Sequence, residues 1–352
     1  MSEKIKVLMI GPARSVNGGI SGVVNNYYNA GLDKQIDLTY IGTMEDGSKI
    51  HKLLVAARAL LKFMTVVSKC DIVHVNMASD VSIYRKMIFI QIASMCKKKI
   101  IIHQHGGHIE EFYYEKCNDN QRKRIQKGLN KADKMLVIAP YLKDIFVNII
   151  DGEKIVVFPD AIEIAVEYEK DYSVQKILFL GRLCKEKGIG ELMDAVSELC
   201  SDYPGLQLYL GGSWVDDDLR KEADHHSDWI RQLGWIDKEE KEKYLKECNI
   251  FALPSYFEGQ SVALLEGMVY GCACVASDVG GIPQMLIHEK TGLLVPAKDT
   301  KGIKEAIGKL LADSQLQKTL GVAARKKIEN EFNLDTNVSQ LVQIYHNIYK
   351  SR

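Results

Sequence analysis

Short runs of apolar, often β-branched residues alternate with longer helical stretches along the whole chain. Nearly every position within these runs is apolar. Such runs are typical of strands buried on both faces, as in a parallel sheet covered by helices. The predicted strands are residues 6–11, 38–42, 71–76, 99–105, 134–139 and 154–159, and then 176–181, 206–212, 230–235, 250–254, 272–277 and 292–296. The pattern therefore predicts an α/β protein with two tandem, doubly wound, Rossmann-like units.

One segment separates the two series of strands. Residues 160–173 are acidic and have no long apolar face, so we place the linker there. Near the end of the chain, residues 334–348 repeat apolar side chains with helical spacing, which predicts an amphipathic helix that needs a surface to bury against. The predicted domains are residues 1–163, residues 164–333 and a final helix over 334–352.

Composition and charge exclude several classes of protein. The 352 residues contain 46 Lys and Arg and 46 Asp and Glu, and this zero net charge disfavours a general nucleic-acid binder. Residues 1–165 are basic (23 against 17), whereas the remainder is acidic (23 against 29). The eight cysteines are scattered, as expected for reduced thiols in a cytoplasmic protein. No apolar run approaches the roughly 20 residues that span a bilayer.

Two stretches of the basic half, residues 48–70 and 81–109, contain no acidic residue. In the first, Arg58, Lys62 and Lys69 fall on one helical stripe, and apolar residues cover most of the rest. A basic, apolar surface fits peripheral contact with anionic lipid at the inner face of the cell membrane. A core helix with a solvated basic stripe explains the same pattern.

Two glutamates eight residues apart, Glu258 and Glu266, bracket the segment FEGQSVALLEGM. Along a helix, eight residues turn about 80° beyond two full turns, so both carboxylates would lie on roughly one side. Gly259, Gln260 and Ser261 mark the predicted helix start, where free backbone N–H groups favour an anion. Two hydroxyl acceptors beside an anion seat suit a sugar nucleotide, and a capped surface helix with two solvated acids remains the alternative.

Other candidate ligand contacts come directly after predicted strands. Gly18 and Gly19 lie in a glycine-rich turn where the backbone could approach a phosphate. The turn is not GxGxxG and no acid ends the second strand, which disfavours a nicotinamide site. Arg182 and Lys187 are two cations that a sharp turn could direct at a diphosphate. A tight strand-to-helix turn and solvated surface charges are the corresponding alternatives.

Two motifs raise the question of a metal. In HQHGGH (103–108) no nearby acid or cysteine completes a ligand set, so we predict no metal. His105 instead is expected to donate a hydrogen bond from the strand tip, or to be a strand-end histidine bonded to backbone. The acids of VDDD (215–218) could form the acidic pair of a metal-dependent nucleotide-sugar enzyme, but a solvated loop explains them.

Taken in order, FLGRLCKEKG, the LGWID turn, ALPSYFEGQSVALLEGMVYG and ASDVGGIPQMLIHEKTGLLVP resemble motifs of glycosyltransferase family 4. The resemblance covers essentially the whole chain and is strongest over residues 176–297. It implies the GT-B fold, in which two Rossmann-like domains face a cleft and a C-terminal helix crosses back onto the N-terminal domain. It also implies a retaining enzyme, as in assembly of capsule or exopolysaccharide.

The resemblance further implies a role for each matching residue. On this basis, Glu258 binds hydroxyls of the donor sugar, Glu266 binds the ribose, and Arg182 and Lys187 bind the diphosphate. The remaining implied contacts are Gly18 and Gly19 over the phosphate, His105 beside the reacting sugar, Trp235 to Asp237 at the base, and Gln260, Ser261 and Val262 at the donor.

Three positions depart from the family pattern. Asp160-Ala161 replace a usual Asn-Gly, Asn76 replaces a frequent histidine, and Gln260-Ser261 stand where an aromatic residue or proline is common. The second and third of these positions are expected near acceptor and donor, so specificity is not carried over from the family.

The expected function is metal-independent, retaining transfer of a hexose-type sugar from a nucleotide-diphosphate sugar, UDP before GDP, to a glycan acceptor. The acceptor is expected to be lipid-linked, and no cofactor or nucleic acid is expected. One alternative is a sugar-nucleotide 2-epimerase of GT-B architecture, which would need acid and base groups beside C2 of the sugar. The other is a module that binds a sugar nucleotide without catalysis.

Overall fold

The computed structural model describes residues 4–16, 18–164 and 169–351, apart from the side chain of Val81. The chain forms two compact units. Unit 1 is Met1–Glu163 together with Leu334–Arg352, and unit 2 is Ile164–Asn333. Within the predicted linker, residues 165–168 lie outside the described residues.

Unit 1 contains a six-stranded sheet in which every neighbouring pair is parallel. The strand order is β2-β1-β3-β4-β5-β6. Its central strands are buried along nearly their whole length, which explains their near-continuous apolar sequences. The strands are β1 (Lys6–Gly11), β2 (Asp37–Gly42), β3 (Ile72–Met77), β4 (Lys99–Gln104), β5 (Lys134–Val137) and β6 (Ile155–Val157).

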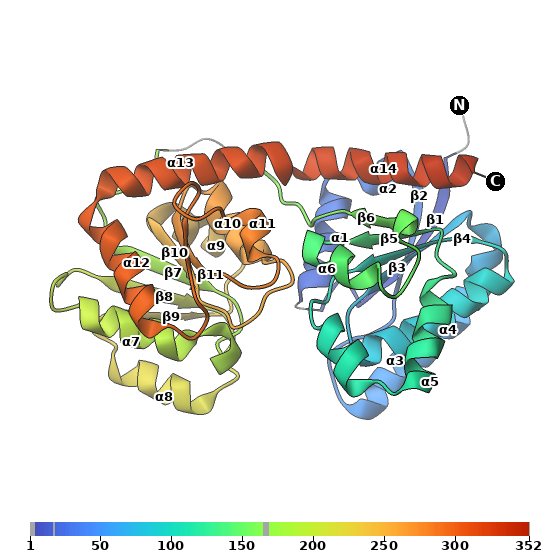
Figure 1. Ribbon diagram of the computed structural model, residues 1–352, viewed down its shortest axis with the longest axis horizontal. Coiled ribbons are helices and arrows are strands. Elements are labelled where there is room, and N and C mark those ends of the chain that lie inside the picture. Colours follow the sequence, from blue (N-terminus) through green and yellow to red (C-terminus); the bar gives the residue numbers. More distant parts are fainter. Residues whose placement is uncertain (1–3, 17, 165–168, 352) are drawn as a thin grey trace. The chain divides into compact units, whose positions relative to one another are not determined.

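Helices cover both faces of this sheet (Figure 1). They are α1 (Gly19–Asn29), α2 (Leu32–Gln35), α3 (Lys49–Val66), α4 (Val81–Met95), α5 (Asp119–Leu129), α6 (Pro140–Phe146) and α14 (Leu334–Lys350), with short turns η1 (Val67–Lys69), η2 (Glu111–Lys116) and η3 (Gly152–Lys154). Phe63 of α3 packs edge-on against Phe89 of α4, with 5.0 Å between ring centroids. Such contacts join the helix layer into the core.

The last helix, α14, belongs to unit 1 and is joined to the segment after β6 by hydrogen bonds. The backbone N–H of Leu334 donates to the carbonyl of Ile162 at 3.0 Å, and the Asn337 amide donates to the carbonyl of Pro159 at 2.9 Å. Leu341 and Tyr345 on its inner face are completely buried. The amphipathic pattern of residues 334–348 therefore predicted this helix correctly.

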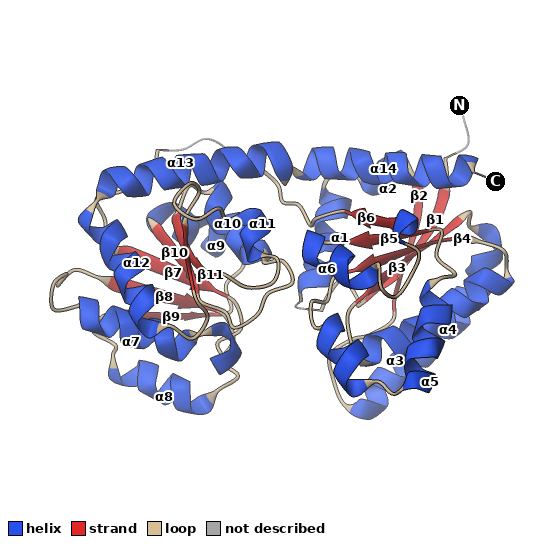
Figure 2. Cartoon of the chain, viewed as in Figure 1, coloured by secondary structure: helices blue, strands red, loops and turns tan. Residues whose placement is uncertain are grey.

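Unit 2 contains a second six-stranded, all-parallel sheet with the order β12-β11-β10-β7-β8-β9 (Figure 2). The strands are β7 (Lys176–Leu180), β8 (Gln207–Gly211), β9 (Ile230–Gly234), β10 (Ile250–Leu253), β11 (Ala273–Ser277) and β12 (Leu293–Val295). The helices are η4 (Lys185–Lys187), α7 (Ile189–Leu199), α8 (Asp217–His225), α9 (Lys238–Glu247), α10 (Val262–Val269), α11 (Ile282–Met285), α12 (Thr300–Ala312) and α13 (Ser314–Glu331). This strand order is that of a Rossmann sheet, and the order in which successive strands are added reverses between β7 and β10.

All twelve predicted strands are confirmed, and their bounds differ from the prediction by at most two residues. The interpretation of residues 215–218 as a solvated loop holds only in part: Asp217 and Asp218 are exposed but form the first turn of helix α8, and the Asp216 carboxylate caps that helix by accepting from the N–H groups of Asp218 and Leu219. Among the described residues, none of the helices combines the length and apolarity needed to cross a bilayer.

Candidate functional site

The switch point of the unit 2 sheet lies between β7 and β10, and ligands of open α/β sheets bind where such neighbouring strands end. The loop that follows β7 contains Arg182 and Lys187, and the loop that follows β10 contains Glu258. Because the two strands are parallel neighbours, their loops meet at one edge of the sheet. The residues that the sequence singled out in this half therefore come together.

The two loops are locked together through their backbones. The N–H of Tyr256 donates to the carbonyl of Glu186 at 2.9 Å. Gly188 has φ +68° and lies so close to Pro254 that a Cβ at this position would overlap the Pro254 carbonyl oxygen. A residue with a side chain would meet both backbone strain and a steric clash here, so this close approach requires glycine.

Lys187 and Glu258 form the centre of the site. The Lys187 ammonium lies 2.5 Å from Oε1 of Glu258, and the Ser255 hydroxyl donates to the same oxygen at 2.7 Å. The two charged side chains are 21% and 10% exposed, so the pair is shielded but reachable. Within the described part of the chain, the second oxygen of Glu258 has no partner and is available to a ligand hydroxyl.

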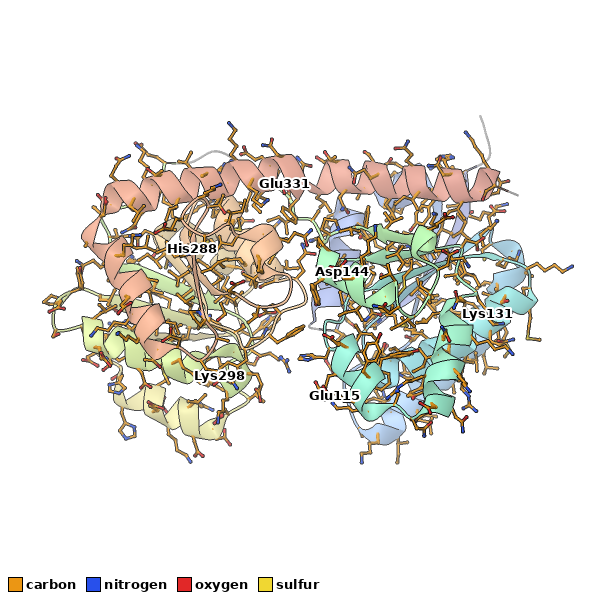
Figure 3. The ribbon with its side chains drawn as sticks, in the orientation of Figure 1. Glu115, Lys131, Asp144, His288, Lys298 and Glu331 are labelled. Atoms are coloured by element: carbon orange, nitrogen blue, oxygen red, sulfur yellow. The ribbon has the colours of Figure 1, made fainter. Side chains whose placement is uncertain are left out.

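Arg182 differs from Lys187 in having an exposed side chain. Its guanidinium makes no hydrogen bond or ion pair with any described residue. A guanidinium with five donors and no protein partner is suited to a phosphate ligand. Lys298, labelled in Figure 3, supplies a further positive charge in this unit, with Nζ 4.7 Å from the centroid of the Tyr256 ring.

The prediction that Glu258 and Glu266 lie two turns apart on one helix is wrong. Helix α10 begins only at Val262, so Glu258 lies in the preceding loop and not two turns back on the same helix. Its backbone is held by the glycine turn after β11, where Gly281 N–H donates to the Glu258 carbonyl at 3.0 Å. Ser261 caps α10 by accepting from the N–H of Leu264 at 3.3 Å. The cap satisfies one helix-end donor and leaves earlier amides of the first turn for an anion.

Glu266 lies within α10 and is paired with a residue that the sequence did not single out. The Lys241 ammonium of α9 lies 2.5 Å from Oε1 of Glu266. Helix α9 is capped by Asp237, which follows the exposed Trp235 at the end of β9. The LGWID turn and Glu266 are therefore linked through α9. Lys241 was missed because its partner is 25 residues away in sequence.

Gly18 and Gly19 follow β1 in unit 1, whose sheet has its own switch point between β1 and β3. Gly18 is extended and precedes the first turn of α1. A Cβ added to either glycine would meet no atom of the described residues within 4 Å. This position is suited to a turn that approaches a phosphate. Steric contacts with the described residues do not require glycine at either position.

His105 follows β4 in unit 1, and its imidazole is buried, with 5% of the side chain exposed. Nε2 lies 3.0 Å from Oδ1 of Asn76, and Nδ1 lies 3.3 Å from Oδ1 of Asp160. The ring of His103 lies 4.0 Å away, centroid to centroid. Burial holds the pKa of His103 well below its usual range, and burial with the nearby His105 lowers the pKa of His74 to about 3.

Asp160 is an acid that lies beside the HQHGGH motif in the structure, although it is distant from the motif in sequence. Ligand atoms of His103, His105 and Asp160 all lie within 4.8 Å of one another. Asp160 follows β6, some 55 residues beyond His105, and the parallel sheet brings the two loops together. These three residues could hold a metal ion, so the prediction that no nearby acid completes a ligand set is wrong.

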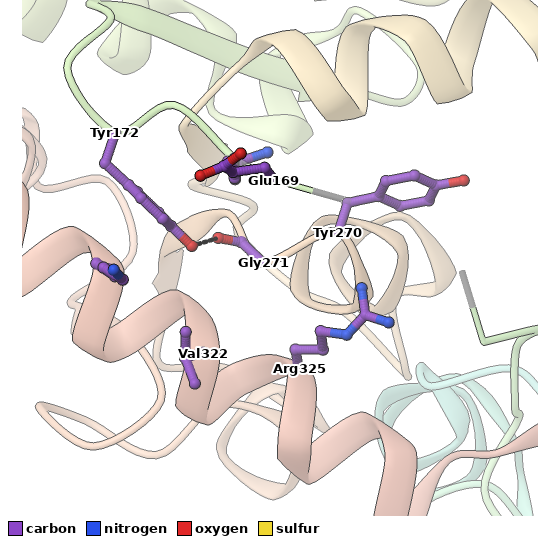
Figure 4. Close-up of a pocket in the computed structure, with 8 residues that line it drawn as sticks. Glu169, Tyr172, Tyr270, Gly271, Val322 and Arg325 are labelled. Carbon is purple, nitrogen blue, oxygen red and sulfur yellow. Dashed lines mark hydrogen bonds between the residues drawn. The ribbon is translucent and has the colours of Figure 1, made fainter. Parts of the chain in front are cut away.

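A separate cavity of about 570 Å³ lies on another side of unit 2 (Figure 4). It is lined by residues that include Tyr172, Tyr270, Val322 and Arg325, and the Tyr172 hydroxyl donates to the carbonyl of Gly271 at 2.9 Å. Gly271 lies ahead of β11, at the amino end of the strands. The cavity therefore does not coincide with the site at their carboxyl ends.

The fold is shared with solved glycosyltransferase structures. A sucrose-phosphate synthase from Thermosynechococcus elongatus matches with a TM-score of 0.81, 18% identity, and coverage of 99% of this chain and 100% of that one. HepE from Anabaena, solved with UDP-glucose, matches with a TM-score of 0.78, 15% identity, and coverage of 97% and 100%. Two Rossmann-like sheets of this arrangement define the GT-B class of fold.

The sequence comparisons match a glycosyltransferase family over part of the chain. Residues 174–313 match the family described as "Glycosyl transferases group 1". The amylovoran biosynthesis glycosyltransferase AmsK of Erwinia amylovora is 31% identical over 185 residues, covering 48% of this chain and 44% of AmsK. The chain spans about half the length of the curated relatives it matches at this level. The match to the group 1 glycosyl transferases therefore covers most of unit 2.

Proposed function

We propose that this protein is a retaining glycosyltransferase that moves a sugar from a nucleotide-diphosphate sugar to a glycan acceptor. The observation that carries the proposal is the group at the switch point of unit 2. There a guanidinium with no partner among the described residues, a lysine–glutamate pair and a capped helix start lie on loops from adjacent strands. These groups match the charges of a sugar diphosphate: cations and amides for the phosphates, and a carboxylate for sugar hydroxyls.

The proposed reaction replaces one bond to the anomeric carbon by another on the same face. The bond from the sugar to the diphosphate breaks, the acceptor oxygen bonds to the anomeric carbon, and the acceptor proton passes to the leaving diphosphate. Arg182, Lys187 and the first amides of α10 stabilise the negative charge on that diphosphate. Glu258 orients the sugar through its available oxygen, and Glu266 with Lys241 binds the ribose end.

His105 is proposed to lie beside the reacting sugar as a positioning group. Its two ring nitrogens already face Asn76 and Asp160, so proton transfer to the acceptor is assigned to the diphosphate and not to this ring. Gly18 and Gly19 are proposed to approach the phosphates, and Trp235, Gln260 and Val262 to contribute donor contacts.

The donor is proposed to carry UDP, as the donor does in the HepE structure with UDP-glucose. A role in cell-surface polysaccharide synthesis is supported by the similarity to AmsK, a protein of amylovoran biosynthesis. Incubation with a panel of UDP- and GDP-sugars without acceptor tests the reaction class. Slow release of free nucleotide, measured by a coupled assay, is expected of a transferase. An epimerised sugar nucleotide would instead indicate a 2-epimerase, and tight binding without any turnover would indicate a binding module.

A lipid-linked acceptor is supported by the outer face of α3. Only a narrow stripe of this helix is buried, formed by Val55, Ala59 and Phe63. At about 100° per residue, the exposed apolar residues form a second stripe on the opposite side. They are Ile50, Leu53, Leu54, Leu61 and Met64. The apolar residues of this stretch are therefore not all core, which supports a surface contact.

The charges around this exposed apolar stripe fit one occupant, an anionic membrane surface. Arg58 and Lys62 lie along one side of the stripe, and residues 48–70 contain no acid. An apolar face bordered by cations is the pattern of a helix that lies in the lipid interface. We propose that α3 places unit 1 against the cytoplasmic leaflet, where a lipid-linked acceptor is found.

Replacing Leu53 and Leu61 together by Ser is expected to lower binding to anionic vesicles by at least about tenfold, because each leucine buries apolar surface in the lipid. These side chains are 71% and 61% exposed, so the fold should be unaffected. Vesicle flotation at low salt measures the binding. Val322→Ser, an exposed apolar residue of unit 2, is the control and should bind like wild type. Equal flotation of all three proteins would contradict the proposal, as would failure of the wild type to float.

A further inference from the structure

One lysine of unit 1 is buried without a carboxylate partner. Lys86 of α4 is 3% exposed, and its ammonium donates a hydrogen bond to the hydroxyl of Thr43. That hydroxyl in turn donates to the carbonyl of Gly11 at 2.9 Å. Glu45, the acid nearest to Thr43 in sequence, lies 3.2 Å from His51 instead. Lys86 has no further hydrogen bond and no ion pair with any described residue, so two of its three N–H groups are unused within the described chain.

The neighbouring residue, Arg85, adds a second cation that no described acid offsets. Its side chain is partly exposed, its Nε atom is buried, and its guanidinium makes no hydrogen bond or ion pair with any described residue. Residues 81–109 contain no acid. Burial and, after it, the nearby charge of Arg85 lower the pKa of Lys86 to about 7. Burying two cations in this way costs free energy, and a bound anion would offset that cost.

The place of the two cations in the fold points to a ligand. Gly11 ends β1, Thr43 follows β2 and α4 follows β3, so Lys86 lies at the carboxyl edge of the unit 1 sheet. Open α/β sheets bind their ligands at this edge. An ammonium and a guanidinium at successive positions of one helix suit a phosphate group. The flexible four-carbon stem of Lys86 allows its ammonium to move from Thr43 to such a ligand.

The surroundings of Lys86 indicate which phosphate this is. Helix α3, for which we propose a membrane contact, begins at Lys49, six residues after Thr43. Its Phe63 packs against Phe89 of α4, and the Lys86 ammonium lies 6.0 Å from the centroid of the Phe89 ring. The cation therefore lies next to the helix that is proposed to contact lipid. In a glycan joined to lipid through phosphate, the phosphate lies at the same boundary between lipid and water.

We propose that Arg85 and Lys86 bind a phosphate group of the acceptor, so that the acceptor is a glycan joined to its lipid through phosphate or diphosphate. This inference rests on the proposed function, because it names the acceptor class of the same enzyme. The diphosphate of the donor is assigned to Arg182 and Lys187 in unit 2. The protein is therefore expected to have two separate phosphate sites, one for each substrate.

Calorimetric titration of pyrophosphate into the protein saturated with UDP, or with GDP if that is the nucleotide bound, tests the site. The nucleotide then occupies the donor site, and the wild type is expected to bind about one equivalent of pyrophosphate in addition. Lys86→Met and Arg85→Gln should each bind pyrophosphate at least about tenfold more weakly, because each removes a charge-assisted contact. Lys97→Gln, which changes an exposed lysine just beyond the other end of α4, is the matched control and should bind like wild type.

The nucleotide titration itself separates this inference from the proposed function. Lys86→Met and Arg85→Gln should bind UDP like wild type, and a loss of UDP affinity would place both residues in the donor site and overturn the inference. A wild type that binds no nucleotide would contradict the proposed function. A wild type that binds nucleotide but no pyrophosphate, or variants that bind pyrophosphate like wild type, would overturn the inference alone. Arg85→Gln breaks no contact with a described residue, so it decides the question even if Lys86→Met fails to fold.

Vesicles separate a phosphate of the acceptor from the headgroup of a membrane phospholipid. Flotation with phosphatidylglycerol vesicles at low salt should be the same for Lys86→Met as for wild type, because the membrane contact is assigned to the exposed stripe of α3. Binding that falls at least about tenfold in Lys86→Met but not in Lys97→Gln would show that the buried cation binds headgroups. That result would overturn the assignment of the site to the acceptor.

Discussion

Replacing Arg182 by Ala is expected to lower the turnover number by about a hundredfold to a thousandfold without lowering the melting temperature. A group that stabilises charge on a leaving group contributes on this scale to the transition state. The Arg182 side chain is exposed and has no hydrogen bond or ion pair with any described residue, so its removal breaks no contact that the fold needs. Steady-state kinetics with the preferred sugar nucleotide and a thermal melt measure the two effects.

Lys187→Ala is expected to differ from Arg182→Ala in its effect on stability. Turnover should fall by a similar factor, but the change also leaves the nearly buried Glu258 without its cation. Leaving such a group poorly satisfied should cost about 1–3 kcal/mol of unfolding free energy, toward the lower end because both side chains reach solvent. Lys185→Ala, an exposed lysine of the same turn, is the matched control for both. Near-normal rates in Arg182→Ala and Lys187→Ala would refute the assignment of the diphosphate site.

Gly188→Ala is expected to destabilise the protein strongly, by about 3 kcal/mol or more. Two costs combine: the left-handed backbone at φ +68°, and overlap of the new Cβ with the Pro254 carbonyl oxygen. Because this contact locks the loop of Lys187 against the loop of Glu258, turnover should fall together with stability. Denaturant unfolding and activity at a temperature where the variant is folded measure both.

Two other glycines separate these costs. Gly234 has φ +66° but open space around its Cβ position, so Gly234→Ala isolates the backbone strain and should cost about 1 kcal/mol. Gly190 is helical and its Cβ would meet only Leu219 Cδ2 at 3.4 Å, so Gly190→Ala should be neutral or stabilising by up to about 1 kcal/mol. A Gly188→Ala variant no less stable than Gly234→Ala would show that the two loops are not locked as described.

The strands could be predicted from sequence because burial on both faces leaves a local mark, a run of apolar residues. The loops that carry Arg182, Lys187 and Glu258 follow such runs, so their common edge followed from the rule that parallel strands end together. The helix start at Ser261 could also be predicted from local sequence, since a serine cap, two residues after Gly259, precedes the apolar run. Placing Glu258 on that helix was wrong because a turn from β11, which is distant in sequence, holds it in the loop.

What the sequence could not show are pairings between distant segments. Lys241 meets Glu266 across 25 residues, and Asp160 meets His105 across 55, and neither partner belongs to a spaced motif. For helix α3, the sequence did not show which face is buried. Its apolar residues form two opposite stripes, and periodicity alone does not tell which one faces the sheet. Only packing of Val55, Ala59 and Phe63 against unit 1 shows that the other stripe is exposed.

The central claim is that the carboxyl edge of the unit 2 sheet binds the diphosphate of a sugar nucleotide. Calorimetric titration of UDP into wild type, Arg182→Ala and Lys185→Ala tests it most directly, because it needs neither the right sugar nor an acceptor. The account predicts that Arg182→Ala binds at least about tenfold more weakly, a loss of about 1.4 kcal/mol or more, while Lys185→Ala binds like wild type. Equal affinity of all three proteins for UDP, or for GDP if that is the nucleotide bound, would contradict it.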